Sequence, residues 1–400
     1  MAGYQGSFKK RTGAMRDGCA TFFKNSVFEC EAVVPVEYFV ADVASLDRDN
    51  VALLVLLQPK CMQQTPAPKL CVANTHLLFN PRRGDVKLAQ LMKLLAEIDQ
   101  LTYRPGVESS YTHRHHPVLL CGDMNMEPFS RLYRFVCDGV LTVDGGYSAA
   151  ELSGQNQRRS YGNPRPMAAV FLGQNAGLTD QSQYVSVCLQ RCAEVTSQTG
   201  DAVSGDVPCE ERFSTTRPAR GVKVVSMDEM PVYTQGSGIV SHEFGLHSVY
   251  NHFTAVNNIG HCRAREVTTC HDLANCTVDY IFYTPSVFVE TCPENDRHPT
   301  KPSETNHSNE SADKEHCKLS TSCQGDKSAS TNGESRSDGS QECSGSRAVD
   351  LCQITNHRLS LVARLQLLSD EEMDDIGELP NQFVSSDHMI LAAEFLLTSE

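Results

Sequence analysis

A carboxylate and an amide stand two residues apart at the end of one predicted strand. Residues 117–121 form a short apolar run, and Gly122-Asp123-Met124-Asn125 follows it directly. Because alternate residues of an extended chain point to the same side, Asp123 and Asn125 are predicted to face one centre. One group can orient a water or a metal ion while the other holds a phosphate oxygen, as a phosphoryl-transfer site requires. The alternative is an Asx turn that closes the strand.

A second pair of polar residues, Asp387 and His388, precedes the apolar run 389–395. As neighbours at the entry of a strand, both can reach one centre. The carboxylate suits a hard metal ion, and the imidazole suits proton transfer or phosphate binding. A capping aspartate followed by a surface histidine is the alternative.

Two further residues that could take part in a reaction lie in apolar surroundings. Asp279 is inside the apolar run 277–284, and His76 lies near the end of the run 69–78. A buried carboxylate is unfavourable unless it is paired, so Asp279 requires a partner. A histidine would complete a dyad in which the carboxylate fixes the tautomer and stabilises the imidazolium. The alternative is a structural aspartate bonded to backbone amides.

Strands must position these side chains. Short apolar runs bounded by charged or turn residues predict at least seven strands, at 17–24, 50–58, 69–78, 117–121, 277–284, 359–368 and 389–397. Apolar residues at helical spacing predict a helix over 84–101 and a shorter one over 130–138. Strands interspersed with helices favour an α/β sandwich of sheets flanked by helices over a helix bundle or a doubly wound array.

Two stretches depart from this pattern. Residues 293–347 contain no Phe, Tyr, Ile, Val or Met, so they cannot bury enough surface to offset their ordering entropy, and we predict a disordered insertion. Residues 152–237 are rich in Gln, Gly, Ser and Thr and predict a loosely ordered insertion. The remaining chain predicts one domain over residues 1–400, assembled from three pieces.

The composition excludes several classes of protein. The formal net charge of −14 repels polyanions, so nucleic-acid binding would need a local basic patch. No apolar run approaches the roughly 18 residues of a membrane span, and the first residues lack the apolar core of a signal peptide, so no membrane association is expected. The 17 cysteines are scattered, some within apolar runs, which favours reduced thiols in a cytoplasmic or nuclear protein.

The order of the polar motifs resembles the signature of the endonuclease/exonuclease/phosphatase superfamily of metal-dependent phosphoesterases. The motifs are Thr75-His76, Gly122-Asp123-x-Asn125, Val278-Asp279-Tyr280 and Ser386-Asp387-His388. Further segments resemble the angel-homologue branch, which is related to nocturnin and the carbon-catabolite-repressor deadenylases. These segments are Arg11-Thr12-Gly13, Asp17-Gly18-Cys19-Ala20, 46–51, 73–78, 80–88, 266–269 and 379–381. The resemblance implies a four-layered, DNase I-like α/β sandwich with its site at one end of two packed sheets.

The resemblance also implies a role for each motif residue. Asp123 would orient the attacking water, Asn125 would hold the scissile phosphate and His76 would stabilise its charge. His388, paired with Asp279, would stabilise the developing negative charge or act as a base. Asp387 would bind a metal ion, and Mg²⁺ is expected because it prefers hard oxygen ligands and substrate phosphate.

A local basic rim is the feature that an acidic protein needs to hold RNA. Candidate substrate-binding residues are Lys9, Lys10, Arg11, Arg82 and Arg83. The alternative is that these side chains are simply solvated.

Two strands of the resembled fold have no counterpart here. Members of the superfamily begin with a strand that carries an Asn and continue to a strand that ends in a metal-binding Glu, and both lie upstream of the segment that resembles residues 3–24. Because that Glu is the principal metal-binding carboxylate of the superfamily, we expect an impaired fragment, from an incomplete gene model or isoform, or a natural pseudoenzyme. We also expect uncovered apolar faces and an open sheet edge.

Three functions follow as hypotheses. The first is a Mg²⁺-dependent phosphoesterase of mRNA metabolism that acts at RNA 3′ ends, either as a 3′ exonuclease of the deadenylase type or as a 2′,3′-cyclic phosphatase. The second is a protein without catalysis that binds RNA or another partner, whose identity the sequence does not indicate. A structural zinc protein is the third and weakest, because Cys262, Cys270 and Cys276 have no evident fourth ligand.

Overall fold

The computed structural model describes residues 3–61, 69–105, 114–143, 148–154, 176–199, 237–252, 265–271, 274–285 and 358–398. All of them belong to one compact unit, built from residues 1–287 and 355–400. The predicted disordered insertion 293–347 lies outside the described residues. Within the described ranges, no helix has the length and apolar character needed to cross a membrane.

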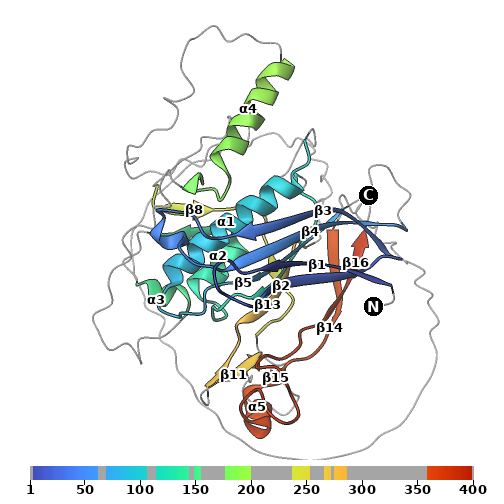
Figure 1. The fold of residues 1–400 in the computed structure, drawn as a ribbon, viewed down its shortest axis with the longest axis vertical. Helices are drawn as coiled ribbons and strands as arrows, with labels where there is room; N and C mark the ends of the chain where they lie inside the picture. The colour runs from blue at the N-terminus through green and yellow to red at the C-terminus, as the bar shows by residue number, and fades with distance from the viewer. Residues whose placement is uncertain are drawn as a thin grey trace, which may run out of the picture. The chain divides into compact units, whose positions relative to one another are not determined.

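A six-stranded mixed sheet forms the centre of this unit (Figure 1). In spatial order its strands are β3 (Phe28–Glu37), β4 (Val51–Pro59), β5 (Leu70–His76), β6 (Val118–Asp123), β13 (Asp279–Tyr283) and β9 (His247–Ser248). All neighbours are antiparallel except β5 and β6. A parallel pair needs a crossover, and helix α1 (Gly84–Thr102) lies in this connection. The crossover brings the carboxyl ends of β5 and β6 to one edge.

Strand β4 is buried on both faces, which explains its unbroken apolar sequence. Ala52, Leu54 and Leu56 belong to the main core with α1 and α2 (Arg131–Asp138). The alternate residues pack with Cys19 and Phe23 of β2 (Gly18–Lys24) in a second cluster. The central sheet therefore has helices on one face and strands on the other.

Two antiparallel strand pairs make the second sheet layer. One is β1 (Tyr4–Lys10) with β2, and the other is β14 (Arg358–Arg364) with β16 (Ala393–Thr398). Among the described elements, no helix covers the outer face of the first pair, where Phe8 is 78% and Phe22 57% exposed. The described residues therefore supply three of the four predicted layers, and two exposed aromatic side chains lie on the outer face of this pair.

Smaller elements surround these layers. They are the 3-10 helix η1 (Ala44–Leu46), α3 (Ala149–Leu152), α4 (Val185–Thr199), α5 (Asp370–Ile376), and the strand pairs β7 (Val140–Thr142) with β8 (Ile239–Ser241), β10 (Glu266–Val267) with β15 (Leu368–Ser369), and β11 (Thr269–His271) with β12 (Ala274–Cys276). The N-terminus of α5 has a capping box in which the Ser369 side chain accepts from the Glu372 N–H.

Helix α4 corrects the prediction that residues 152–237 are loosely ordered throughout. Arg191 of α4 forms an ion pair with the buried Asp99 of α1, with 2.9 Å between Nη2 and Oδ2. The Arg191 guanidinium also lies 3.7 Å from the centre of the Tyr103 ring. These contacts join residues far apart in the chain, so neither local composition nor apolar periodicity reveals them.

Candidate active site

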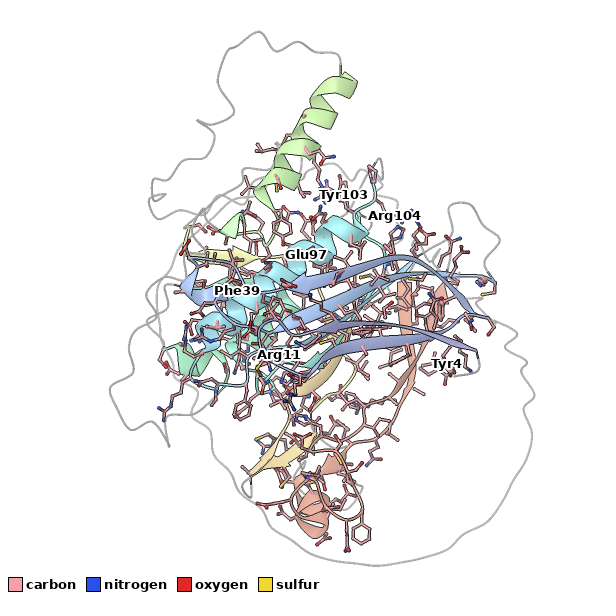
Figure 2. All side chains as sticks on the ribbon, viewed as in Figure 1. Tyr4, Arg11, Phe39, Glu97, Tyr103 and Arg104 are labelled. Carbon is pink, nitrogen blue, oxygen red and sulfur yellow. The ribbon has the colours of Figure 1, made fainter. Side chains whose placement is uncertain are left out.

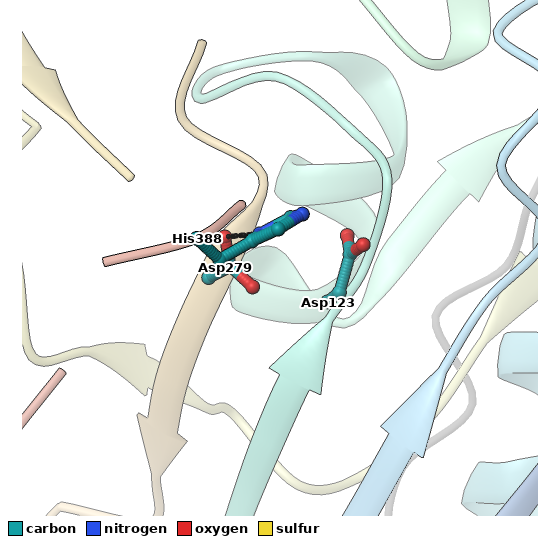
Figure 3. A group of neighbouring side chains, drawn as sticks. All are labelled: Asp123, Asp279 and His388. Carbon is teal, nitrogen blue, oxygen red and sulfur yellow. Dashed lines mark hydrogen bonds and ion pairs between the residues drawn. The ribbon is translucent and has the colours of Figure 1, made fainter. Parts of the chain in front are cut away.

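Three side chains meet at one edge of the central sheet. Asp123 ends β6, Asp279 begins the adjacent β13, and the two are direct partners in the antiparallel register. His388 comes from the loop before β16. One potential ligand atom from each of the three lies within 4.8 Å of the others (Figure 3). The structure thus assembles residues that are 265 positions apart in the sequence, from 123 to 388.

The loop that carries His388 is held against β11. The Met389 N–H donates to the Thr268 carbonyl at 2.7 Å, and the Thr269 hydroxyl donates to the Asp387 carbonyl at 2.7 Å. Beneath the loop, an apolar cluster includes Val267, Met373, Leu379, Val384 and Met389. These contacts fix the loop backbone on both sides of His388.

Asp279 is the partner of His388, in agreement with the requirement that a buried carboxylate be paired. Nδ1 of His388 lies 2.7 Å from Oδ2 of Asp279. This hydrogen bond and the charge of Asp279 raise the pKa of His388 to about 9, against the opposing effect of burial. The imidazole is therefore held in its protonated, cationic form at neutral pH.

Replacing Asp279 with Asn is expected to lower the pKa of His388 from about 9 to its ordinary value near 6.5 or below. The substitution removes the carboxylate that stabilises the imidazolium, while the burial that favours the neutral ring remains. NMR titration of the His388 ring measures the change. Asp387→Asn is the control, because Asp387 has a smaller effect on the same pKa. Equal shifts in the two variants would contradict the assigned pairing.

Asp123 has an environment that disfavours its charge. Burial and the neighbouring charge of Asp279 raise the pKa of Asp123 to about 6, although His76, the Asn125 N–H and His388 act in the opposite direction. Nε2 of His76 lies 3.3 Å from Oδ2 of Asp123. His76 and Asp123 are also register partners across the parallel strands β5 and β6. The sheet therefore places the predicted His76 beside Asp123.

Asn125 is held close to Asp123 by its backbone and its side chain. The Asn125 N–H donates to Oδ1 of Asp123 at 2.8 Å, which is the Asx turn considered as the alternative from sequence. Its Nδ2 donates to Oδ2 of Asp123 at 3.2 Å and to the Leu77 carbonyl at 3.1 Å. Asn125 also has a φ of 49°, in the left-handed region that Asn tolerates. The Asx turn therefore does not exclude a functional role, because it holds the Asn125 amide beside the Asp123 carboxylate.

The predicted metal ligand Asp387 does not join this cluster. Its side chain is exposed, and among the described residues the group able to hold an ion consists of Asp123, Asp279 and His388. The neighbouring His388 turns toward Asp279 while Asp387 remains at the surface. The chain bends at Ser386 and Asp387, where the His388 N–H donates to the Ser386 hydroxyl at 3.1 Å.

The five predicted substrate-binding residues lie on exposed or half-buried positions, and three of them form ion pairs. Lys9 pairs with Glu37, Arg11 with Asp17 at 3.2 Å, and Arg83 with Asp85 at 2.9 Å. Lys10 Nζ donates to the Arg11 carbonyl at 3.1 Å, and the Arg82 N–H donates to Asn80 Oδ1 at 2.9 Å. Arg11 follows β1 directly (Figure 2). Their role as a basic rim stays a prediction.

Three buried polar residues behind the site were not predicted from the sequence. Asn50, Lys87 and Gln90 are 2%, 0% and 0% exposed. Burial lowers the pKa of Lys87 to about 8, although the charge of Asp123 opposes this shift. The one feature of the sequence that could have indicated their burial is that Lys87 and Gln90 each precede a leucine on the apolar face of α1, Leu88 and Leu91. Polar residues at the margin of such a stripe are normally solvated, so the signal was not decisive.

The donor set of the site fits a divalent cation in part. Two carboxylates, Asp123 and Asp279, offer the hard oxygen atoms that Mg²⁺ prefers. Their mutual repulsion contributes to the raised pKa of Asp123, and a bound cation would relieve it. The third candidate, His388, already uses Nδ1 to bind Asp279.

Comparison with known proteins agrees with this fold. The model of the Endonuclease/Exonuclease/phosphatase family matches residues 2–303. The chain therefore belongs to this family, which confirms the family resemblance and the fold class inferred from the sequence.

Within the family, the chain is similar over nearly its full length to the angel homologues. It is 34% identical to protein angel homolog 2 of Bos taurus, over 99% of this chain and 56% of that protein. It is also 34% identical to protein angel homolog 1 of Rattus norvegicus, over 99% of this chain and 52% of that protein. The chain thus spans about half the length of the curated relatives it matches.

A solved structure extends the comparison to three dimensions. The crystal structure of ANGEL2, a 2′,3′-cyclic phosphatase, in complex with adenosine-2′,3′-vanadate matches with a TM-score of 0.60 and 30% identity. The match covers 98% of this chain and 74% of that one.

Proposed function

We propose that this protein is a metal-dependent phosphoesterase that acts on RNA 3′ ends and opens terminal 2′,3′-cyclic phosphates. The observation that carries the proposal is the meeting of Asp123 with the Asp279–His388 ion pair at one sheet edge. The similarity to ANGEL2, a 2′,3′-cyclic phosphatase, supports this choice of substrate.

In this proposal Asp123 accepts the proton of the attacking water, and His388 donates a proton to the leaving oxygen. Asp123 orients a water and takes its proton as the water oxygen bonds to phosphorus. One P–O bond of the cyclic phosphate breaks, and the leaving ribose oxygen takes up a proton, for which the His388 imidazolium is the available acid. His76 and His388 also place positive charge or N–H donors beside the phosphoryl oxygens.

Members of the family are generally dependent on a divalent metal. We propose Mg²⁺, held by the carboxylates of Asp123 and Asp279, with the exposed Asp387 as a further candidate. When bound, the ion would act as a Lewis acid on the phosphoryl oxygens.

Chelation with EDTA is expected to abolish turnover of an oligoribonucleotide that ends in a 2′,3′-cyclic phosphate, and added Mg²⁺ is expected to restore it. The reason is that Asp123 and Asp279 repel one another, and the substrate phosphate, without a cation. Product separation by gel measures the rate. Turnover that is indifferent to EDTA would contradict the metal dependence.

The second candidate is a 3′ exonuclease of the deadenylase type. It is favoured by 37% identity over 185 residues to carbon catabolite repressor protein 4 homolog 3 of Arabidopsis thaliana, which covers 46% of this chain. A poly(A) substrate with a free 3′ hydroxyl, tested beside the cyclic phosphate, separates the two. Shortening of poly(A) with an intact cyclic phosphate would favour the exonuclease. Binding of both without turnover would favour a protein without catalysis.

A further inference from the structure

Two buried polar side chains of α1 lie directly behind the site. Lys87 and Gln90 are both fully buried, and they are three residues apart, so they occupy one face of the helix. Lys87 reaches the loop that follows β6, and Gln90 reaches the segment that follows β5. The helix thus contacts both segments that carry site residues.

Lys87 holds the loop that contains Asn125. Its ammonium donates to the Asn125 carbonyl at 2.6 Å and to the hydroxyl of the buried Ser153 at 3.2 Å. The Ser153 carbonyl in turn accepts from the Glu127 N–H at 2.9 Å. These bonds fix a turn whose central residue, Asn125, has a positive φ. They therefore fix the direction in which the Asn125 amide meets Asp123.

Gln90 holds the segment that contains His76. Its Oε1 accepts from the Leu78 N–H at 3.0 Å, and its Nε2 donates to Oδ1 of Asn50 at 3.3 Å. Asn50 then donates through Nδ2 to the His76 carbonyl at 3.0 Å. The backbone on both sides of Leu77 is thereby tied to α1. A change at Gln90 would act on His76 through two hydrogen bonds.

A fold that needed only packing would place apolar side chains here. A buried ammonium loses its hydration, and its attraction to Asp85, Asp123 and Glu127 offsets that loss only partly, because burial still lowers the pKa of Lys87. Volume-matched apolar residues can fill such positions without large loss of stability. The polar pair is therefore better explained by what it holds in place than by its contribution to packing.

We propose that Lys87 and Gln90 are positioning residues that set the spacing of Asn125 and His76 around Asp123. The inference rests on the proposed phosphoesterase function. Neither side chain needs to touch the substrate, since both are buried. Their effect on the reaction passes through the backbone of the two segments that they hold.

Lys87→Met and Gln90→Met are expected to lower kcat on the cyclic phosphate by about 10- to 100-fold with KM changed less than about twofold, as displaced supporting contacts typically do. Lys87→Gln, which keeps an N–H donor for the Asn125 carbonyl, is expected to retain more activity than Lys87→Met. Lys93→Met is the matched control, because Lys93 lies on the same helix without contact to the site. A kcat for both Met variants equal to that of Lys93→Met would overturn the proposal.

Hydrogen exchange gives a second measurement that does not depend on turnover. The Leu78 N–H is expected to exchange at least about tenfold faster in Gln90→Met than in the unchanged protein. The two protons of the Asn125 side-chain amide are expected to exchange faster in Lys87→Met. If the unchanged protein had no activity but its Leu78 N–H exchanged slowly, the result would count against the phosphoesterase function and not against the positioning role. Unchanged exchange at both positions in folded variants would overturn the positioning role.

Discussion

Replacing Gly122 with alanine is expected to destabilise the protein by about 4 kcal/mol or more, enough to unfold a marginally stable domain. A Cβ at this position would lie 1.8 Å from the Thr75 carbonyl oxygen, and that atom belongs to the backbone of β5, which cannot rotate away. Gly122 also has a φ of 138°, a conformation that L side chains rarely adopt. Steric overlap and backbone strain therefore act together.

The Gly122 prediction can be measured as the change in the free energy of unfolding by urea. Gly245→Ala is the control, because Gly245 also has a positive φ, of 51°, but a Cβ there would have no heavy atom within 4 Å. That variant is expected to lose only about 1 kcal/mol, from strain alone. Similar losses in the two variants would show that β5 and β6 do not approach one another as closely as described.

Asp123→Asn is expected to reduce turnover of a 2′,3′-cyclic phosphate by about 10³-fold while leaving the fold intact. The amide keeps the oxygen that accepts from the Asn125 N–H, so the turn is preserved. It loses the negative charge and the proton acceptor that the proposed reaction requires. Initial rates at saturating substrate measure the effect, with circular dichroism as the check on folding.

Asp138→Asn is the matched control for that variant. Asp138 is an exposed residue at the end of α2, so its neutralisation changes the net charge equally without touching the site. Its rate is expected to equal that of the unchanged protein. If Asp123→Asn were as active as Asp138→Asn, Asp123 would have no part in the chemistry.

The sequence predicted the part of the site that depends on strands. Gly122-Asp123 closes an apolar run, and a carboxylate inside the apolar run 277–284 needs a partner, so strand geometry and the energy of burying charge indicate Asp123 and Asp279 as candidates one at a time. The family resemblance added the order of the motifs. The register that sets Asp279 opposite Asp123 then follows from the fold.

The supporting contacts depend on long-range packing, which local patterns do not contain. Lys87 and Gln90 are residue types that usually lie at the solvated edge of a helix. They are buried here because α1 packs beside the segments that follow β5 and β6. Arg191 is similar, because its partner Asp99 is 92 residues away. The position of Asp387 outside the group of Asp123, Asp279 and His388 is also set by the fold of its loop, so its predicted role as a metal ligand stays a prediction.

The most direct test of the central claim is phosphorus NMR of a dinucleotide 2′,3′-cyclic phosphate incubated with this chain and Mg²⁺. If the residues gathered around Asp123 form a working phosphoesterase site, the cyclic phosphate signal disappears and a phosphate monoester signal grows at the same rate. A cyclic phosphate that stays intact at concentrations of chain and Mg²⁺ where binding is measurable would contradict the claim.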